Sequence, residues 1–259
     1  MIATQDTDTI AHLAQADLLL WLASWLRPPG AARDALPSTH ELFALLAAAG
    51  LRETPQLAER VTALHEAIAA TDVDAQRHEH HRLFDAGIAC PINETAYVRR
   101  DKGAILGDVA GFYNAFGFTT REGVGDKPDH LACQLEYVAM LLMLIAQAQQ
   151  AGEPDNAELT RKALASFAGD HVDAWVGLFC ARLRDTTRLR LHAALADAIE
   201  TTWHALVERH GLPRAEGVAA GAPREEPETP YACGMAEAEA VAGAGAGNVE
   251  VRVAGQTME

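Results

Sequence analysis

The sequence has few cysteines, few aromatic residues and few basic residues, and each shortage excludes a class of protein. Its four cysteines lie dozens of residues apart with no C-x-x-C pair, unlike a secreted disulfide framework. Aromatic residues make up 6% of the 259 residues, whereas residues that favour burial reach 49%, led by alanine and leucine. This balance favours packed helices over a sheet. We therefore expect an all-α protein whose thiols stay reduced in the cytoplasm.

The shortage of basic residues and of long apolar runs excludes further classes. The 21 Lys and Arg against 36 Asp and Glu give a formal net charge of -15, and binding of nucleic acid requires clustered Lys and Arg. The apolar stretch at 18–22 follows acidic residues, the reverse of a secretory signal. The run at 138–146 is shorter than the roughly 20 residues that cross a bilayer. We expect no nucleic-acid partner and no stable membrane insertion.

Common catalytic and phosphate-binding motifs are also missing. The chain has no G-x-S-x-G, no G-x-x-x-x-G-K-[ST] and no strand-borne G-x-G-x-x-G. His78 and His81 stand one helical turn apart, a spacing that can bind Zn²⁺ or Fe, but no H-E-x-x-H and no second pair of ligands accompanies them. We interpret the polar string at 76–82 as a solvated helix face, and we expect no metal and no other cofactor.

Hydrophobic periodicity predicts one compact helical domain of about eight to ten helices over residues 1–212. The helix at about 129–150 is apolar nearly all round beyond Tyr137, so we expect it to be the central buried helix, in which Glu136 needs a partner. Asp170 is the expected N-cap of the helix that follows it. The predicted helices lie at about 7–26, 40–49, 54–68, 72–84, 105–116, 129–150, 157–167, 172–183 and 189–210.

The composition changes abruptly after the last predicted helix. In residues 213–259 Gly, Ala, Pro and Glu dominate, and eight Glu against three Arg give this segment five net negative charges. Such a segment cannot bury enough apolar surface to order itself. We expect an acidic, disordered tail over 213–259.

Four blocks in the middle of the chain carry a resemblance to a known family. They are R-L-F at 82–84, C-P-I-N-E-T-A-Y at 90–97, G-F-Y-N-A-F-G-F at 111–118 and K-P-D-H-L-A-C-Q-L-E-Y at 127–137, and His171, Trp175 and Phe179 continue the pattern. In this order they resemble the TorD/DmsD/NarJ family of redox-enzyme maturation chaperones, over roughly residues 75–185. One position departs from that pattern, because Gln134 stands where the family usually has a Glu.

The resemblance implies a TorD-like helical fold and a cytoplasmic chaperone without catalysis of its own. Members of the family bind the N-terminal twin-arginine signal, or another N-terminal segment, of a molybdenum-cofactor enzyme. They hold it until the cofactor is in place and then release it to export or membrane assembly. The implied partner is the catalytic subunit of a molybdoenzyme of the dimethyl sulfoxide reductase type.

A twin-arginine peptide offers a basic head and an apolar stretch, so its receptor needs carboxylates beside an apolar groove. Each candidate also has a structural interpretation: Asp129 could be a helix cap and the aromatic residues could belong to the core. The candidate peptide-binding residues are Asp129, His130, Glu136, Glu94, Tyr97, Pro91, Phe84 and Phe116.

Two other functions and the oligomeric state remain open from the sequence. A nucleotide- or metal-dependent hydrolase could use Asp129, His130 and Glu136 with the His78/His81 pair, although the phosphate loop and the ligand spacing are missing. The chain could instead be a structural helical subunit of a mature enzyme. It could act as a monomer or as a domain-swapped homodimer.

Overall fold

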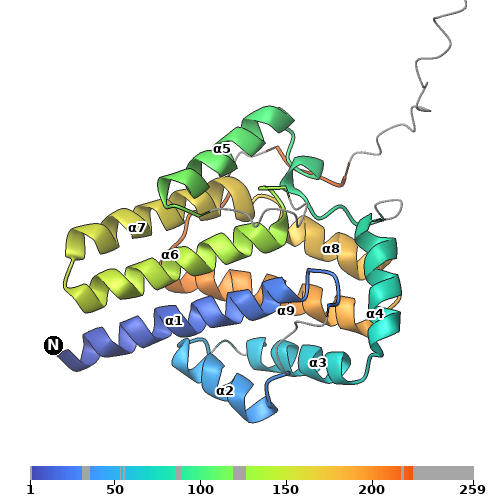
Figure 1. Cartoon of the computed structure of the whole chain (residues 1–259), viewed down its shortest axis with the longest axis horizontal. Helices are drawn as coiled ribbons and strands as arrows, with labels where there is room; N and C mark the ends of the chain where they lie inside the picture. The colour runs from blue at the N-terminus through green and yellow to red at the C-terminus, as the bar shows by residue number, and fades with distance from the viewer. Residues whose placement is uncertain are drawn as a thin grey trace, which may run out of the picture. The chain divides into compact units, whose positions relative to one another are not determined.

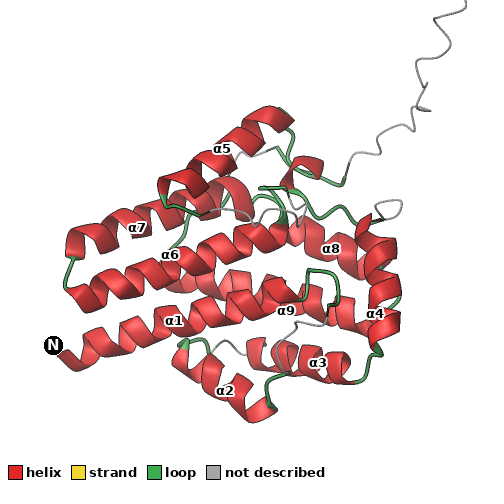
Figure 2. Ribbon diagram, in the orientation of Figure 1, coloured by secondary structure: helices red, strands yellow, loops and turns green. Residues whose placement is uncertain are grey.

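The computed structural model describes residues 2–30, 36–52, 54, 56–85, 89–118, 127–216 and 219–223. Within these residues the chain forms helices and loops, with two isolated β-bridges and no strand (Figure 2). The all-α prediction is therefore confirmed. The α-helices are α1 (Ile2–Ser24), α2 (Thr39–Ala48), α3 (Leu57–Ala69), α4 (Val73–His80), α5 (Lys102–Ala115), α6 (Leu131–Ala151), α7 (Pro154–Phe167), α8 (Val176–Thr186) and α9 (Arg190–His210).

Helix α6 is the central helix, as predicted. It packs most extensively against α1, and it also packs against α7 (Figure 1). By length and composition alone α6 could cross a membrane, but 72% of its most apolar stretch is buried inside the protein, as is typical of a core helix. Its predicted inward face is fully buried: Leu131, Leu135, Val138, Leu142 and Ile145.

The other apolar stripes that the periodicity predicts also face the core. Trp203 of α9 and Trp175, just before α8, are among the largest fully buried side chains. Further members of these stripes, all buried, are Leu57, Val61, Leu64 and Ile68 of α3, Phe179 and Leu183 of α8, and Leu195, Ile199 and Leu206 of α9.

Ion pairs join α3 and α8 to α9 at the edge of the core. Arg184 of α8 pairs with Asp197 at 3.1 Å and with Glu200 at 2.8 Å, one turn apart on α9. Arg60 of α3 pairs with the second oxygen of Asp197 at 3.2 Å. Because the side chains are about one-third exposed, these pairs fix the register of the helices more than they stabilise the fold.

The prediction that Asp170 caps the next helix is wrong. The helical backbone does not end at Gly169 but continues through a π-helical turn, Ala168–Val172. Helix α8 begins only after Trp175. Gly169 is needed for close approach rather than for ending a helix, because a Cβ there would lie 2.9 Å from the Pro213 ring.

The described residues after α9 contact the helical body. The carboxylate of Asp173 accepts hydrogen bonds from Arg214 at 3.1 Å and from the Ala215 N–H at 2.9 Å. Residues 97–99 and 219–221 exchange backbone hydrogen bonds, including one from the Gly221 N–H to the Tyr97 carbonyl at 3.1 Å. The predicted boundary at residue 212 stays a prediction, and residues 224–259 of the predicted tail lie outside the described residues.

We expect a chain that ends at Leu212 to be less stable than a chain that ends at Pro223. The shorter chain loses the two bonds to Asp173 and the pairing with residues 97–99, which we expect to cost about 2 kcal/mol and about 4–8 °C in Tm. Thermal unfolding of the two truncated chains measures the difference. Equal melting temperatures would mean that residues 213–223 do not stabilise the fold.

Candidate functional site

The second and fourth sequence blocks lie against each other at the start of α6. Residues 92–94 run antiparallel to residues 129–131: the Glu94 N–H donates to the Asp129 carbonyl and the Leu131 N–H donates to the Ile92 carbonyl, both at 3.0 Å. His130 is the N-cap of α6, and its Nδ1 accepts from the Ala132 N–H at 3.1 Å. The loop at 90–97 and the first turn of α6 therefore form one rigid unit.

Asp129 is fully buried and acts within this unit. One oxygen of its carboxylate accepts from the Asn93 amide at 3.0 Å, and the other accepts from the Thr95 N–H at 3.1 Å. The second bond therefore satisfies a backbone N–H group at the start of a 3₁₀ turn, Glu94–Ala96. Asp129 thus ties the loop to α6, and its side chain does not reach the surface.

Glu94 lies at the centre of a buried polar cluster that we call the Glu94 cluster: Glu94, Gln134, His171 and Trp175. The Gln134 amide donates to Glu94 at 2.6 Å, and Nδ1 of His171 lies 3.2 Å from both carboxylate oxygens. All four side chains are at most 1% exposed. Burial raises the pKa of Glu94, although the hydrogen bonds from His171 and Gln134 oppose the rise.

Gln134, where the family usually has Glu, fits this cluster because an amide both donates and accepts. Its nitrogen donates to Glu94 while its oxygen accepts from the Trp175 indole N–H at 3.1 Å. A carboxylate at this position would place a second negative charge beside Glu94 in the protein interior. The departure from the family pattern is thus compensated within the cluster.

Tyr97 and Pro91 belong to the same rigid unit. The Tyr97 hydroxyl donates to the Pro91 carbonyl at 2.7 Å, and its ring stacks on Trp175 with the centroids 5.3 Å apart. Burial raises the pKa of Tyr97. Tyr97 is fully buried and Pro91 is half-buried, so only Pro91 is accessible to a partner.

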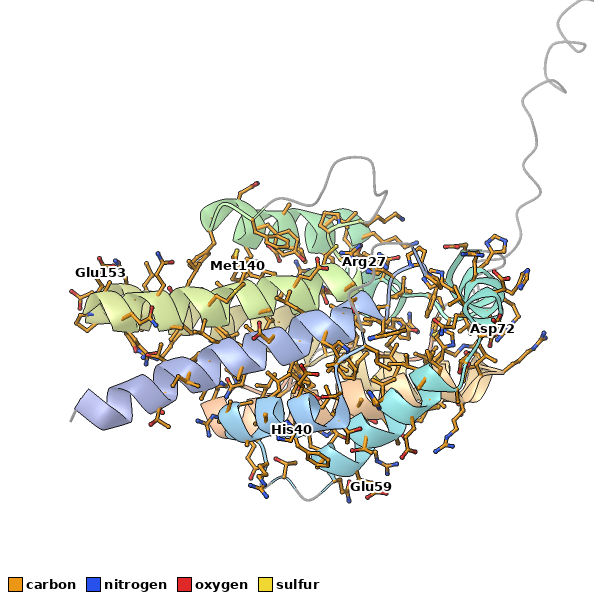
Figure 3. All side chains as sticks on the ribbon, turned by 60° about the horizontal axis from the view of Figure 1, so that its bottom comes forward. Arg27, His40, Glu59, Asp72, Met140 and Glu153 are labelled. Carbon is orange, nitrogen blue, oxygen red and sulfur yellow. The ribbon has the colours of Figure 1, made fainter. Side chains whose placement is uncertain are left out.

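Glu136 has the partner that the sequence analysis required. Both oxygens of Glu136 lie within 3.0 Å of the Arg27 guanidinium, which follows α1. The two side chains are 26% and 27% exposed, so the pair lies at the surface. Figure 3 shows Arg27 where the end of α1 meets α6, and Met140 farther along α6.

Half-buried aromatic side chains pack on Tyr137, the residue that follows Glu136 on α6. The Phe116 ring at the end of α5 and the Phe118 ring approach Tyr137, the residue after Glu136, with centroid distances of 6.4 Å and 5.6 Å. Phe84 is also half-buried, but it packs on His80 and on Phe179 of α8. We call Arg27, Phe116, His130, Glu136 and Met140 the Arg27–Glu136 surface. All five side chains are half-buried.

The interpretation of the string at 76–82 as a solvated face is wrong in part. His78 and His81 are exposed, but Gln76, Glu79 and His80 are buried. The periodicity of this string gave no sign of burial because its inward residues are polar, and only the contacts made by distant loops reveal their role.

Glu79 is a buried hydrogen-bond acceptor that the sequence reasoning missed. Its carboxylate accepts two bonds from Arg82, at 2.8 Å and 2.7 Å, and one from the Arg188 N–H at 2.6 Å. These bonds lower the pKa of Glu79 to about 2, against the effect of burial. Arg82, the first residue of the R-L-F block, also donates to the Thr186 carbonyl at 2.7 Å, so the pair fixes α4 to the loop between α8 and α9.

The residues proposed for a hydrolase do not form a catalytic arrangement. Asp129 bonds to Asn93 and Thr95, His130 caps α6, and Glu136 pairs with Arg27. Among the described residues, no group of three or more His, Cys, Asp or Glu side chains is placed to hold a metal ion. The three cysteines in the described part of the chain are buried and form no disulfide.

Comparison with known proteins agrees with the four sequence blocks. The profile of the nitrate reductase delta subunit family matches residues 51–181, half of the chain. The dimethyl sulfide dehydrogenase assembly chaperone protein of Rhodovulum sulfidophilum is 38% identical over 87 residues, which are 32% of this chain and 34% of that protein. The chain thus aligns with about a third of the length of this curated relative.

All four blocks, the Glu94 cluster and the Glu79–Arg82 pair fall within the matched residues. The resemblance inferred from the blocks is therefore confirmed. The chain belongs to the nitrate reductase delta subunit family of NarJ/TorD-like chaperones, a family of non-catalytic proteins.

Proposed function

We propose that this protein is a cytoplasmic assembly chaperone that binds the N-terminal signal or segment of a molybdoenzyme catalytic subunit of the dimethyl sulfoxide reductase type. It holds this segment during cofactor insertion, before export or assembly. The observation that carries the proposal is the Arg27–Glu136 surface, where the accessible Glu136 carboxylate lies one turn of α6 from the half-buried Met140. The name of the Rhodovulum relative, an assembly chaperone for a dehydrogenase, supports the same class of client.

The recognition step is an exchange of cations on Glu136. In the free protein Arg27 makes a two-oxygen contact with Glu136, the geometry that an arginine of the client would make. An ion pair at the surface contributes only about 0–1 kcal/mol, so displacing Arg27 costs the client little. Arg27 therefore keeps the Glu136 carboxylate oriented until a client arginine replaces it.

The other candidate residues divide into contact and positioning groups. His130, Pro91, Phe84 and Phe116 are accessible and contact the client in this proposal. Glu94, Tyr97 and Asp129 are fully buried with internal partners, so they position the loop at 90–97 and the start of α6.

The exchange predicts opposite effects on binding for two variants that break the same ion pair. We expect Glu136→Gln to weaken binding about ten- to a hundred-fold, because the client loses a charge-assisted hydrogen bond. We expect Arg27→Gln to strengthen binding by up to about fivefold, because a competing cation is removed. The measurement is calorimetric titration of a synthetic peptide with an Arg-Arg pair followed by an apolar stretch.

Asp129→Asn is the control for a positioning role. It should lower the melting temperature more than Glu136→Gln does, since the buried carboxylate accepts two bonds, and it should change peptide affinity less. Equal weakening by Arg27→Gln and Glu136→Gln would show that the ion pair supports the surface without being exchanged. Unchanged affinity in all variants would remove this surface from the binding site.

A structural subunit of a mature enzyme differs from a chaperone in its fate. A chaperone leaves after assembly, so we expect the protein to be absent from the purified molybdoenzyme and to be recovered with the immature catalytic subunit. Its presence in the purified enzyme in a one-to-one ratio would favour the structural role.

A further inference from the structure

A polar pocket lies at the opposite end of α6 from the Arg27–Glu136 surface. It has a volume of about 330 Å³ and is bounded by α1, α6, α7 and the end of α9. Gln149, which lines it, follows Glu136 by thirteen residues, so the two sites are about 20 Å apart along the helix. In Figure 1 the start of α1, the turn between α6 and α7 and the end of α9 gather at this end of the bundle.

Two histidine rings meet in this pocket. The centroids of His12 and His210 are 5.4 Å apart, and each ring uses one nitrogen in a hydrogen bond within the protein. Nδ1 of His12 lies 2.7 Å from the Asp8 carbonyl, so it carries the proton. Nε2 of His210 lies 2.7 Å from the Gln15 side-chain oxygen, whose amide nitrogen donates to the Ala49 carbonyl, so Nε2 is also the protonated nitrogen.

These hydrogen bonds assign the second nitrogen of each ring as the one that is deprotonated in the neutral form. In His12 this is Nε2 and in His210 it is Nδ1. A proton added there gives each ring a second N–H donor. Protonation of the two rings therefore adds two N–H donors to the pocket, one on each ring.

Two arginines complete the lining on the cationic side. Arg161 of α7 and Arg209 of α9 line the pocket, whereas Asp8 is the one acidic side chain among the described residues that line it. Arg161 also forms an ion pair with Glu158 at 3.6 Å, on the exposed side of α7. Arg209 donates to the Gly50 carbonyl at 3.4 Å. In a chain with a net charge of -15, such a local excess of positive charge is unusual.

We propose that this pocket binds a small oxyanion, a phosphate or a carboxylate group, between Arg161, Arg209 and the two histidine rings. Guanidinium groups and imidazolium N–H groups are the donors that such anions prefer. The bound charge would stabilise the protonated histidines, so binding takes up protons. Nothing in this proposal depends on the molybdoenzyme client, because the site shares no residue with the Arg27–Glu136 surface.

The directions in which the histidine pKa values shift agree with proton uptake on binding. Burial lowers the pKa of His210 to about 4, with His12, Arg209 and Arg161 adding to the effect. Burial also lowers the pKa of His12, opposed by its bond to the Asp8 carbonyl and by the Asp8 charge and assisted by both arginines. At neutral pH both rings are thus neutral, and an anion that offsets the arginine charges raises both pKa values.

The first test is calorimetric titration of inorganic phosphate into the full chain at constant ionic strength, in two buffers that differ in ionisation enthalpy. We expect proton uptake on binding, and an affinity that rises as the pH falls from 7.5 to 6, by up to about tenfold per pH unit for each proton taken up. Titration of succinate under the same conditions distinguishes a phosphate site from a carboxylate site. Absence of binding by both anions would overturn the proposal.

Matched variants localise the binding. Arg161→Gln removes an exposed arginine that pairs with Glu158, three residues earlier. Arg77→Gln is the matched control, because Arg77 on α4 is also exposed, also pairs with an acidic residue three positions earlier, Asp74, and lies far along the chain from the pocket. We expect Arg161→Gln to weaken phosphate or succinate binding about tenfold or more and Arg77→Gln to leave it unchanged. Equal weakening by both variants would mean non-specific attraction and would overturn the proposal.

The histidine signals provide a readout in the unmodified protein. In the NMR spectrum, the ring protons of His12 and His210, assigned with His12→Gln and His210→Gln, should titrate at higher pH when the anion is present than in chloride. His40 and His78, which are exposed outside the pocket, serve as internal controls. Unshifted titration of both pocket histidines would contradict the proposal even if an anion bound elsewhere.

Discussion

Replacement of Glu94 by alanine should destabilise the protein by about 3–5 kcal/mol, the range for removing one partner from a buried pair. The variant leaves the Gln134 amide and Nδ1 of His171 facing a cavity, and both lost their water on folding. The unfolding free energy from urea titration at pH 7 measures the loss. Since a domain of this size has a total stability of about 5–15 kcal/mol, the variant would be marginal at 37 °C.

The conservative variant Glu94→Gln separates shape from charge. It keeps the volume and one acceptor oxygen for Gln134 but places an amide group near His171, so we expect a smaller loss of about 1–2 kcal/mol. Glu59→Ala on α3, which removes a glutamate outside this cluster, should change stability by less than about 0.5 kcal/mol. A loss below 1 kcal/mol for Glu94→Ala would mean that the site relaxes or admits water.

Replacement of Glu79 by alanine should cost about 2–3 kcal/mol at pH 7. The carboxylate is 8% exposed and holds Arg82 together with the Arg188 N–H and the Thr187 hydroxyl, so its loss releases the joint between α4 and the loop before α9. The effect depends on pH in a defined direction, because the bonds lower the pKa of Glu79 to about 2 from an ordinary value of 4.5.

A lowered carboxyl pKa means that the folded protein binds the proton more weakly than the unfolded chain does. The contribution of Glu79 is therefore fully present above about pH 4.5 and is lost as the pH falls toward about 2. Urea unfolding of the wild type and of Glu79→Ala at pH 7 and pH 3 should show a smaller difference at pH 3. A difference that grew with acidity would contradict the ionised pair.

The control for Glu79 lies on the same helix. Asp74 pairs with Arg77 three residues later, as Glu79 pairs with Arg82, but its side chain is 73% exposed. We expect Asp74→Asn to change stability by less than about 1 kcal/mol at either pH, because exposed ion pairs contribute little. The comparison isolates burial as the cause of the larger effect at Glu79.

The amino-acid sequence by itself determined the helical class, the apolar stripes and the family. Helical periodicity is local, so Leu131 and Ile145 could be assigned to one buried face of α6 before any contact was known. The same reasoning required a partner for Glu136, since a carboxylate on a buried helix needs a compensating charge. The four ordered blocks sufficed for the family because each combines several residues at fixed spacing.

Only the tertiary structure decided the partners of the polar side chains. The sequence could not identify Arg27 as the partner of Glu136, 109 residues away, nor join Glu94 to His171, 77 residues away. Such pairs depend on how helices cross, and hydrophobic patterning carries no record of which polar groups meet. For the same reason Asp129 was expected at a groove and lies in the interior, while Glu79 was assigned to solvent and holds two elements together.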